Sequence, residues 1–239
     1  MIIECLLAAA ALALLALFLL LPGHASFAKK APFSGWCYAH RGLHSPDKSV
    51  PENSLAAFAA AADAGYGMEL DVQLSKDGEV VVFHDDTLDR VTGVAGRVDA
   101  FDWAELKEMP LCGTGHHMPL FTEVLATVAG RTPLIVELKS GPRNKELCRK
   151  TLALLRSYDG AFCVESFDPT IVAWFRRNAP DILRGQLSDS CASFRKDGSS
   201  LCTANDDGGK ITAYGYGYYW SKGETEPLLE TQRIALDGR

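Results

Sequence analysis

The feature that most constrains the fold of this chain is a set of charged residues at the ends of apolar, β-branched segments. Four such segments end in or carry the motifs His40-Arg41-Gly42, Glu69-Leu70-Asp71, His84-Asp85 and Glu137-Leu138-Lys139. Strands of a parallel sheet are buried on both faces, so charge is expected only where their carboxyl ends build a site. The sequence therefore predicts parallel strands that bring two histidines, three carboxylates and a lysine together.

Strand and helix patterns alternate along most of the chain. Strands are expected at residues 36–39, 67–74, 80–83, 134–139, 162–167 and 182–187. Helices are expected at residues 55–64, 103–109, 122–129, 145–157 and 168–178. This alternation is typical of a parallel α/β fold, and functional residues at the ends of several strands favour a (β/α)₈ (TIM) barrel over a doubly wound sheet. With about six recognisable strands, the barrel is predicted to be incomplete.

Composition excludes several classes of function. The net charge of −6 and the lack of any Lys/Arg-rich run give no support for nucleic-acid binding. The seven cysteines are scattered and contain no C-x-x-C pair, which argues against a disulfide framework or a zinc ribbon. No G-x-G-x-x-G or P-loop motif is present, which weakens a nucleotide-binding interpretation. No feature indicates a protein partner.

The first segment of the chain has the character of a membrane anchor. Residues 5–21 contain no polar side chain, and a helix of that length is long enough for a bilayer core. We therefore expect a transmembrane anchor at residues 1–23 and a linker at 24–35. Lys29 and Lys30 follow the apolar run, so the positive-inside rule favours a cytoplasmic domain after the anchor. The alternative is export after cleavage of a signal peptide near Ser26-Phe27-Ala28.

The strand at residues 67–74 indicates metal-assisted chemistry on a phosphate. Its period of two places Glu69 and Asp71 on one face and the aliphatic residues on the other. With Glu137 they form a set of oxygen ligands that suits Mg²⁺ or Ca²⁺ better than zinc. His40 and His84 could supply the base and the acid that phosphodiester hydrolysis requires. Arg41 and Lys139 could hold the phosphate.

Each of these residues also has an ordinary structural interpretation. Glu69 and Asp71 could face solvent on an edge strand, and Glu137 could simply pair with Lys139. His84 could be a structural histidine. The agreement of four separate strand ends favours a site. His44, His116 and His117 lie in polar loops and are weaker candidates, whereas Glu165, at another strand end, is a candidate for the rim of the site.

The same residues resemble the glycerophosphodiester phosphodiesterase family, and in particular its membrane-anchored bacterial type. The resemblance covers residues 36–190, and it consists of HRG at 40–42, PENS at 51–54, AGY at 64–66, ELDVQLSKDGEVVVFHD at 69–85, TLDRVTG at 87–93, ELK at 137–139, ESF at 165–167 and RGQ at 184–186. It implies a TIM barrel that binds one divalent cation, Mg²⁺ or Ca²⁺. It also implies a phosphoric diester hydrolase that converts a small-molecule substrate such as glycerophosphocholine into glycerol 3-phosphate and an alcohol.

The resemblance also assigns roles to individual residues. His40 and His84 match the general acid/base pair of the family. The metal ligands match Glu69, Asp71 and Glu137. Phosphate contacts match Arg41 and Lys139, and Glu52 is similar to a residue that supports the substrate site.

Residues 191–239 depart from the family pattern. They are rich in Gly, Ser and Asp and lack a strand–helix repeat, so we treat them as an atypical tail and expect a truncated barrel. Two other functions therefore stay open. The chain could be a phospholipase D-like hydrolase of lysophospholipids, or a non-catalytic truncated remnant.

Overall fold

The computed structural model describes residues 10–12, 14, 25 and 27–188, together with the backbone of two short strands at 214–216 and 233–235. The predicted anchor at 1–23 and the predicted tail at 191–239 therefore lie almost entirely outside the described residues. Within the described part of the chain, none of the helices combines the length and the apolar character that crossing a membrane requires.

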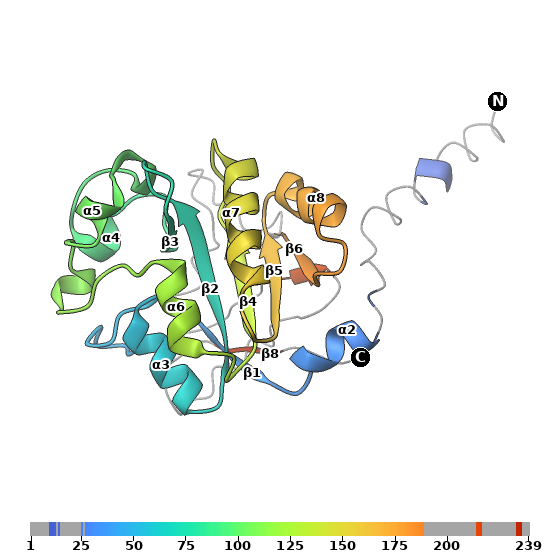
Figure 1. Ribbon diagram of the computed structural model, residues 1–239, viewed down its shortest axis with the longest axis horizontal. Helices are drawn as coiled ribbons and strands as arrows, with labels where there is room; N and C mark the ends of the chain where they lie inside the picture. Colours follow the sequence, from blue (N-terminus) through green and yellow to red (C-terminus); the bar gives the residue numbers. More distant parts are fainter. Residues whose placement is uncertain are drawn as a thin grey trace.

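Five parallel strands form the centre of one sheet (Figure 1). In spatial order they are β6 (Arg184–Ser188), β5 (Phe162–Ser166), β4 (Leu134–Leu138), β2 (Gly67–Leu74) and β1 (Cys37–His40). Two antiparallel strands extend its edges, namely β7 (Tyr214–Tyr216) beside β6 and β8 (Arg233–Ala235) beside β1. The predicted parallel α/β architecture is thus confirmed as a half-barrel.

The third predicted strand does not belong to the parallel set. Strand β3 (Val80–Val82) pairs antiparallel with the end of β2 and lies off the main path of the sheet. The turn at Lys76-Asp77-Gly78 is too short for the crossover of a dozen or more residues that parallel strands require, so a hairpin is the only solution. Of the six predicted strands, five enter the half-barrel and one forms this hairpin.

Four helices connect the parallel strands, close to their predicted bounds. They are α3 (Leu55–Asp63), α6 (Phe121–Val128), α7 (Asn144–Arg156) and α8 (Pro169–Asn178). Ser54 caps α3 by accepting a hydrogen bond from the Ala57 N–H, and Asp168 caps α8 in the same way through Thr170. Shorter helices complete the described chain, namely α2 (Phe27–Lys30), η1 (Ala31–Phe33), α4 (Asp89–Thr92), η2 (Val98–Ala100), α5 (Trp103–Leu106) and η3 (Leu111–Gly113).

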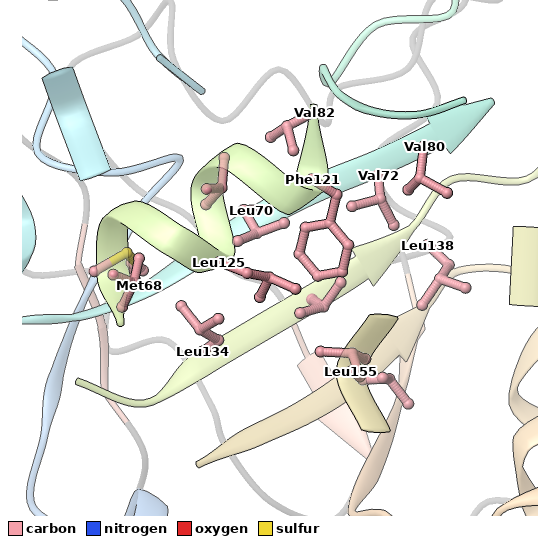
Figure 2. Close-up of a cluster of buried hydrophobic side chains, with 14 of the residues drawn as sticks. Met68, Leu70, Val72, Val80, Val82, Phe121, Leu125, Leu134, Leu138 and Leu155 are labelled. Atoms are coloured by element: carbon pink, nitrogen blue, oxygen red, sulfur yellow. The ribbon is translucent and has the colours of Figure 1, made fainter. Parts of the chain in front are cut away.

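All four connecting helices pack on one face of the sheet, where the main hydrophobic core lies. Figure 2 shows aliphatic side chains of β2 and β4, such as Leu70 and Leu134, meeting Phe121 and Leu125 of α6. Burying each such side chain contributes about 1.5–3 kcal/mol to stability. This core therefore fixes the strands from one side and leaves their other face for the interior of the half-barrel.

The interior face changes from apolar to polar along each strand. At the amino ends of the strands, Tyr38, Ile135 and Cys163 form a second buried cluster. Two residues further along the same face lie His40, Glu137 and Glu165, in keeping with the period of two. The apolar layer fills the interior at the amino ends of the strands, and the polar layer lies on the carboxyl side of it.

The chain between β3 and α6 forms a small satellite unit that carries α4, α5 and the two 3₁₀ turns (Figure 1). It has a hydrophobic cluster of its own, composed of Val81, Phe83, Leu88, Val91, Val98, Leu106, Leu111 and Met118. Because this cluster begins at β3 and at the residue before His84, the unit is fixed to the carboxyl edge of the sheet. Residues projecting from it can therefore take a defined position next to the interior polar layer.

Gly42 is the position where the backbone after β1 is most tightly constrained. Its φ is +79°, and a Cβ there would lie 2.8 Å from Cβ and 2.9 Å from the carbonyl carbon of Ala57 in α3. Gly65 has a similar φ of +73°, but a Cβ there would meet nothing within 4 Å. We expect Gly65→Ala to cost about 1–2 kcal/mol for the left-handed conformation. Gly42→Ala should cost a further ~1–3 kcal/mol for overpacking.

Urea unfolding of the two variants measures this difference directly. Equal losses of unfolding free energy in both variants would show that the contact between Gly42 and Ala57 is not tight. A larger loss at Gly42 would show that α3 fixes the backbone on which Arg41 is carried.

Candidate active site

Three carboxylates meet in the interior of the half-barrel. Glu69 and Asp71 project from β2, and Glu137 lies opposite Asp71 in the register of β4. One oxygen of each residue lies within 4.8 Å of the others, and all three side chains are buried. The edge-strand alternative is wrong, because β2 lies between β1 and β4 and both carboxylates face inward.

This cluster fits a divalent cation. Oxygen Oε1 of Glu69 and Oδ1 of Asp71 are buried and have no hydrogen-bond partner among the described residues. Buried polar atoms normally have a hydrogen-bond partner, so converging carboxylate oxygens without one are an expected feature of a metal site. Carboxylate oxygens are also the ligands that Mg²⁺ and Ca²⁺ prefer.

The cluster is electrostatically strained without a cation. Burial, together with the nearby charges of Asp71 and Glu137, raises the pKa of Glu69 well above its usual range. Burial alone would also raise the pKa of Asp71, but nearby positive charges hold it well below the usual range; these are on His84, Lys139 and Arg41. Repulsion between the carboxylates is therefore balanced only in part by the side chains around them.

Two cations border the carboxylates, the buried Arg41 and the partly buried Lys139. Lys139, just after β4, lies 2.8 Å from Glu137 and 3.4 Å from Asp71. Arg41 follows β1 with a left-handed φ of 57°, which turns its backbone N–H toward Glu69 at 3.0 Å. Its guanidinium donates to Glu52 at 2.9 Å and lies 3.6 Å from Asp71. Both cations are thus placed beside any phosphate bound at the cluster.

The two histidines predicted to act as acid and base differ in environment. Nε2 of His40, at the end of β1, lies 3.8 Å from Glu69. Burial and the nearby charge of Arg41 lower the pKa of His40, which favours a neutral ring able to accept a proton. His84 follows β3 and is 30% exposed, with Nδ1 only 2.6 Å from Oδ1 of Asp85.

The structure adds two residues that sequence patterns missed. Asn53, in the PENS motif, donates from Nδ2 to Oδ2 of Asp71 at 2.9 Å, whereas its neighbour Ser54 is the helix cap. Asn53 has a left-handed φ of 53°, a conformation that Asn tolerates better than most residues. The residue type at this position was therefore the one sequence signal of its role. Gln73, on the same face of β2 as Asp71, donates from Nε2 to the carbonyls of Phe83 and Asp85 at 2.8 and 2.9 Å. It therefore fixes the backbone on both sides of His84.

The remaining candidate residues are Glu165, which lies inside the half-barrel, and three further histidines. Glu165 is 3% exposed and lies opposite Glu137 in the sheet, so it is inside the half-barrel rather than at its rim. Burial raises its pKa, and the neighbouring carboxylates raise it further, Glu69 most of all. Nε2 of His44 is buried, and burial lowers the pKa of this histidine. His116 and His117 lie in the satellite unit beside η3, where His117 is exposed.

A half-barrel of parallel strands with catalytic-type side chains at the carboxyl ends defines the class of TIM-barrel-like enzymes. Comparison with known sequences specifies the family. The model of the glycerophosphoryl diester phosphodiesterase family matches residues 40–219, and the chain belongs to this family.

Two relatives of known name match part of this chain. The chain is 42% identical over 112 residues to a glycerophosphodiester phosphodiesterase of Caldanaerobacter subterraneus, which covers 43% of this chain and 44% of that protein. It is 34% identical over 164 residues to a lysophospholipase D of Mus musculus, which covers 61% of this chain and 47% of that protein. The chain thus spans about half the length of these curated relatives.

A solved structure is similar in fold. An Oleispira antarctica phosphodiesterase, in complex with the product sn-glycerol-3-phosphate, superposes with a TM-score of 0.57 and 29% identity, and the match covers 62% of this chain and 63% of that one. This likeness shows that the chain shares its fold with a phosphodiesterase.

Proposed function

We propose that this protein hydrolyses glycerophosphodiesters such as glycerophosphocholine to sn-glycerol 3-phosphate and an alcohol, with one divalent cation, Mg²⁺ or Ca²⁺. The observation that carries the proposal is the convergence of Glu69, Asp71 and Glu137, with His40 and Lys139 beside them. The family match and the names of the relatives support it.

The proposed metal ligands are Glu69, Asp71 and Glu137. A cation bound there would neutralise charge on the non-bridging oxygens of the phosphate. Arg41 and Lys139 contact the same oxygens, and both are held in place by their ion pairs with the carboxylates. Glu52 acts on the substrate indirectly, because it fixes the guanidinium of Arg41.

Proton transfer is assigned to the two histidines. Asp85 accepts a hydrogen bond from Nδ1 of His84 and so leaves Nε2 as the nitrogen that can transfer a proton; His84 is assigned as the acid that protonates the leaving alkoxide. His40 is then the base, which takes a proton from the hydroxyl group of the attacking water. Overall, water is added across the P–O bond; His40 then releases its proton to solvent and His84 takes one up, so both rings return to their starting states.

The first test is release of sn-glycerol 3-phosphate from glycerophosphocholine by the full chain in mild detergent. We expect turnover with added Mg²⁺ or Ca²⁺ and none with EDTA, and a separate titration of each ion identifies the preferred one. Turnover that persists in EDTA would contradict the metal dependence. Absence of turnover from a cooperatively unfolding protein would contradict glycerophosphocholine as substrate.

A second candidate function is supported by the lysophospholipase D relative. Such an activity would release choline and lysophosphatidic acid from lysophosphatidylcholine at the same site. The same preparation should therefore be assayed with both substrates, and the ratio of kcat/KM decides between them. A protein that unfolds cooperatively but turns over neither would favour the non-catalytic alternative.

We also propose that residues 1–23 anchor the protein in a membrane, with the barrel domain in the cytoplasm. The apolar run at residues 5–21 and the lysines after it support this proposal. Fractionation of cells that express the full chain, compared with a variant lacking residues 1–23, tests it. Release of a shortened protein to the outside would instead support the signal peptide.

A further inference from the structure

The side chain of Arg90, on helix α4 of the satellite unit, binds two carboxylates at once. Its Nε and Nη2 donate to Asp85 at 2.6 and 3.1 Å. Its Nη1 and Nη2 donate to Glu52 at 3.0 and 2.6 Å. Only the planar fork of an arginine can hold two carboxylates in this way, since an ammonium group is a single point of charge.

These contacts join the two sides of the candidate active site. Asp85 is hydrogen-bonded to Nδ1 of His84 at 2.6 Å, and Glu52 accepts from Arg41 at 2.9 Å. A continuous series of side chains therefore runs from His84 through Asp85, Arg90 and Glu52 to Arg41. Burial would raise the pKa of Glu52, but its hydrogen bond with Arg90 and the charge of Arg41 lower it to about 2, so it stays ionised in this series.

The backbone that carries this series is rigid, whereas its central side chain is accessible. Leu88 and Val91, on either side of Arg90, are buried in the satellite cluster. Gln73 holds the Asp85 carbonyl from below. The Arg90 side chain itself is 48% exposed, so its removal should not disturb the core. Without it, the Asp85 carboxylate would lose two of its three hydrogen bonds and become free to rotate away from His84.

We propose that Arg90 is a positioning residue, which acts through Asp85 to hold the His84 ring in one orientation and one tautomer while fixing Arg41 through Glu52. This inference rests on the proposed function, in which His84 is the acid. An Asp85 carboxylate that accepts from Nδ1–H leaves Nε2 as the reacting nitrogen. Arg90 does not need to contact the substrate for this role.

The first test compares Arg90→Gln with Arg156→Gln in the full-length protein. Arg156 is a matched control, because its side chain is 50% exposed and donates two hydrogen bonds to one carboxylate, that of Asp181. Neither residue belongs to the series that joins His84 to Arg41. We expect Arg90→Gln to lower kcat for glycerophosphocholine by roughly 100-fold, the cost of a misplaced catalytic group, with KM changed by less than about threefold. Arg156→Gln should match the wild type.

A double substitution determines whether Arg90 acts through Asp85. In the Asp85→Asn background, Arg90→Gln should cost little more, because residues that act as a unit are not additive. A loss of the same size in both backgrounds, or an effect on KM alone, would show that Arg90 binds substrate directly and would overturn the proposal. So would an Arg90→Gln variant as active as the Arg156→Gln control.

A readout that needs no turnover separates this inference from the proposed function. Long-range ¹H–¹⁵N NMR of histidine rings reports the tautomer of His84, with His84→Ala used for assignment. At a pH where the His84 ring is neutral, we expect a single Nδ1–H tautomer in the wild type and a mixture of tautomers in Arg90→Gln. An unchanged spectrum would overturn the positioning role even if the enzyme is active. If the wild type is inactive but its spectrum differs from that of Arg90→Gln as expected, only the proposed function is refuted.

Discussion

Replacing His84 with alanine is expected to slow hydrolysis of glycerophosphocholine by about 10²- to 10⁴-fold, the usual contribution of a positioned general acid or base. The choline alkoxide is a poor leaving group and requires a proton as the P–O bond breaks. His84 is the histidine whose Nδ1 is held by a carboxylate, at 2.6 Å, which leaves Nε2 to transfer that proton. We expect the loss in kcat rather than in KM.

The leaving group of the substrate distinguishes the acid from the base. With a glycerophosphate ester of p-nitrophenol, which leaves without a proton, the loss in His84→Ala should fall to a small factor. The loss in His40→Ala should stay large for both substrates, because the attacking hydroxyl still needs a base. His117→Ala, at an exposed position, is the control. Equal losses for both substrates in His84→Ala would contradict its assignment as the acid.

The strands of the half-barrel and the position of the carboxylates were predictable from local sequence patterns. Alternation along residues 67–74 fixed the face of Glu69 and Asp71, and parallel strands necessarily bring their carboxyl ends to one edge. The inward position of Glu137 followed from the same rule. The exception was β3, where the hydrophobic pattern identified a strand but carried no information about its direction.

The contacts around the site were less predictable, because they join residues distant in sequence. Glu52 and Arg90 are 38 positions apart, and the satellite unit between β3 and α6 has no strong periodicity that would place Arg90 against Glu52. Local sequence patterns favour Asn53 as a helix cap, whereas the fold uses it to hold Asp71. Such pairs depend on how the satellite unit folds back, which only tertiary structure determines.

The second large effect is expected in the free energy of unfolding of Glu69→Gln, measured without metal. Glu69→Gln should raise the free energy of unfolding in EDTA by about 1–2 kcal/mol at pH 7, within the usual range for a single substitution. The substitution removes one charge from a buried cluster, while an amide oxygen can still accept the hydrogen bond from the Arg41 N–H. The same variant should lose the metal-dependent gain of the wild type, which amounts to about 2.7 kcal/mol at a cation concentration of a hundred times Kd.

The stability advantage of Glu69→Gln in EDTA depends on pH because the pKa of Glu69 is raised in the folded wild type. Burial is the main cause of this raised pKa, and the neighbouring carboxylates are the second. In the unfolded chain the residue ionises near its ordinary value of about 4.3, so the wild type loses stability as pH rises above that value, until pH reaches the raised pKa of the folded state. Glutamine carries no such penalty, and the advantage of Glu69→Gln should therefore be larger at pH 7 than at pH 5. Urea unfolding in EDTA at both pH values measures it, with the exposed Glu108→Gln as the control. A Glu69→Gln variant less stable than the wild type in EDTA, or one still stabilised by Mg²⁺ or Ca²⁺, would mean that the three carboxylates do not form the metal site.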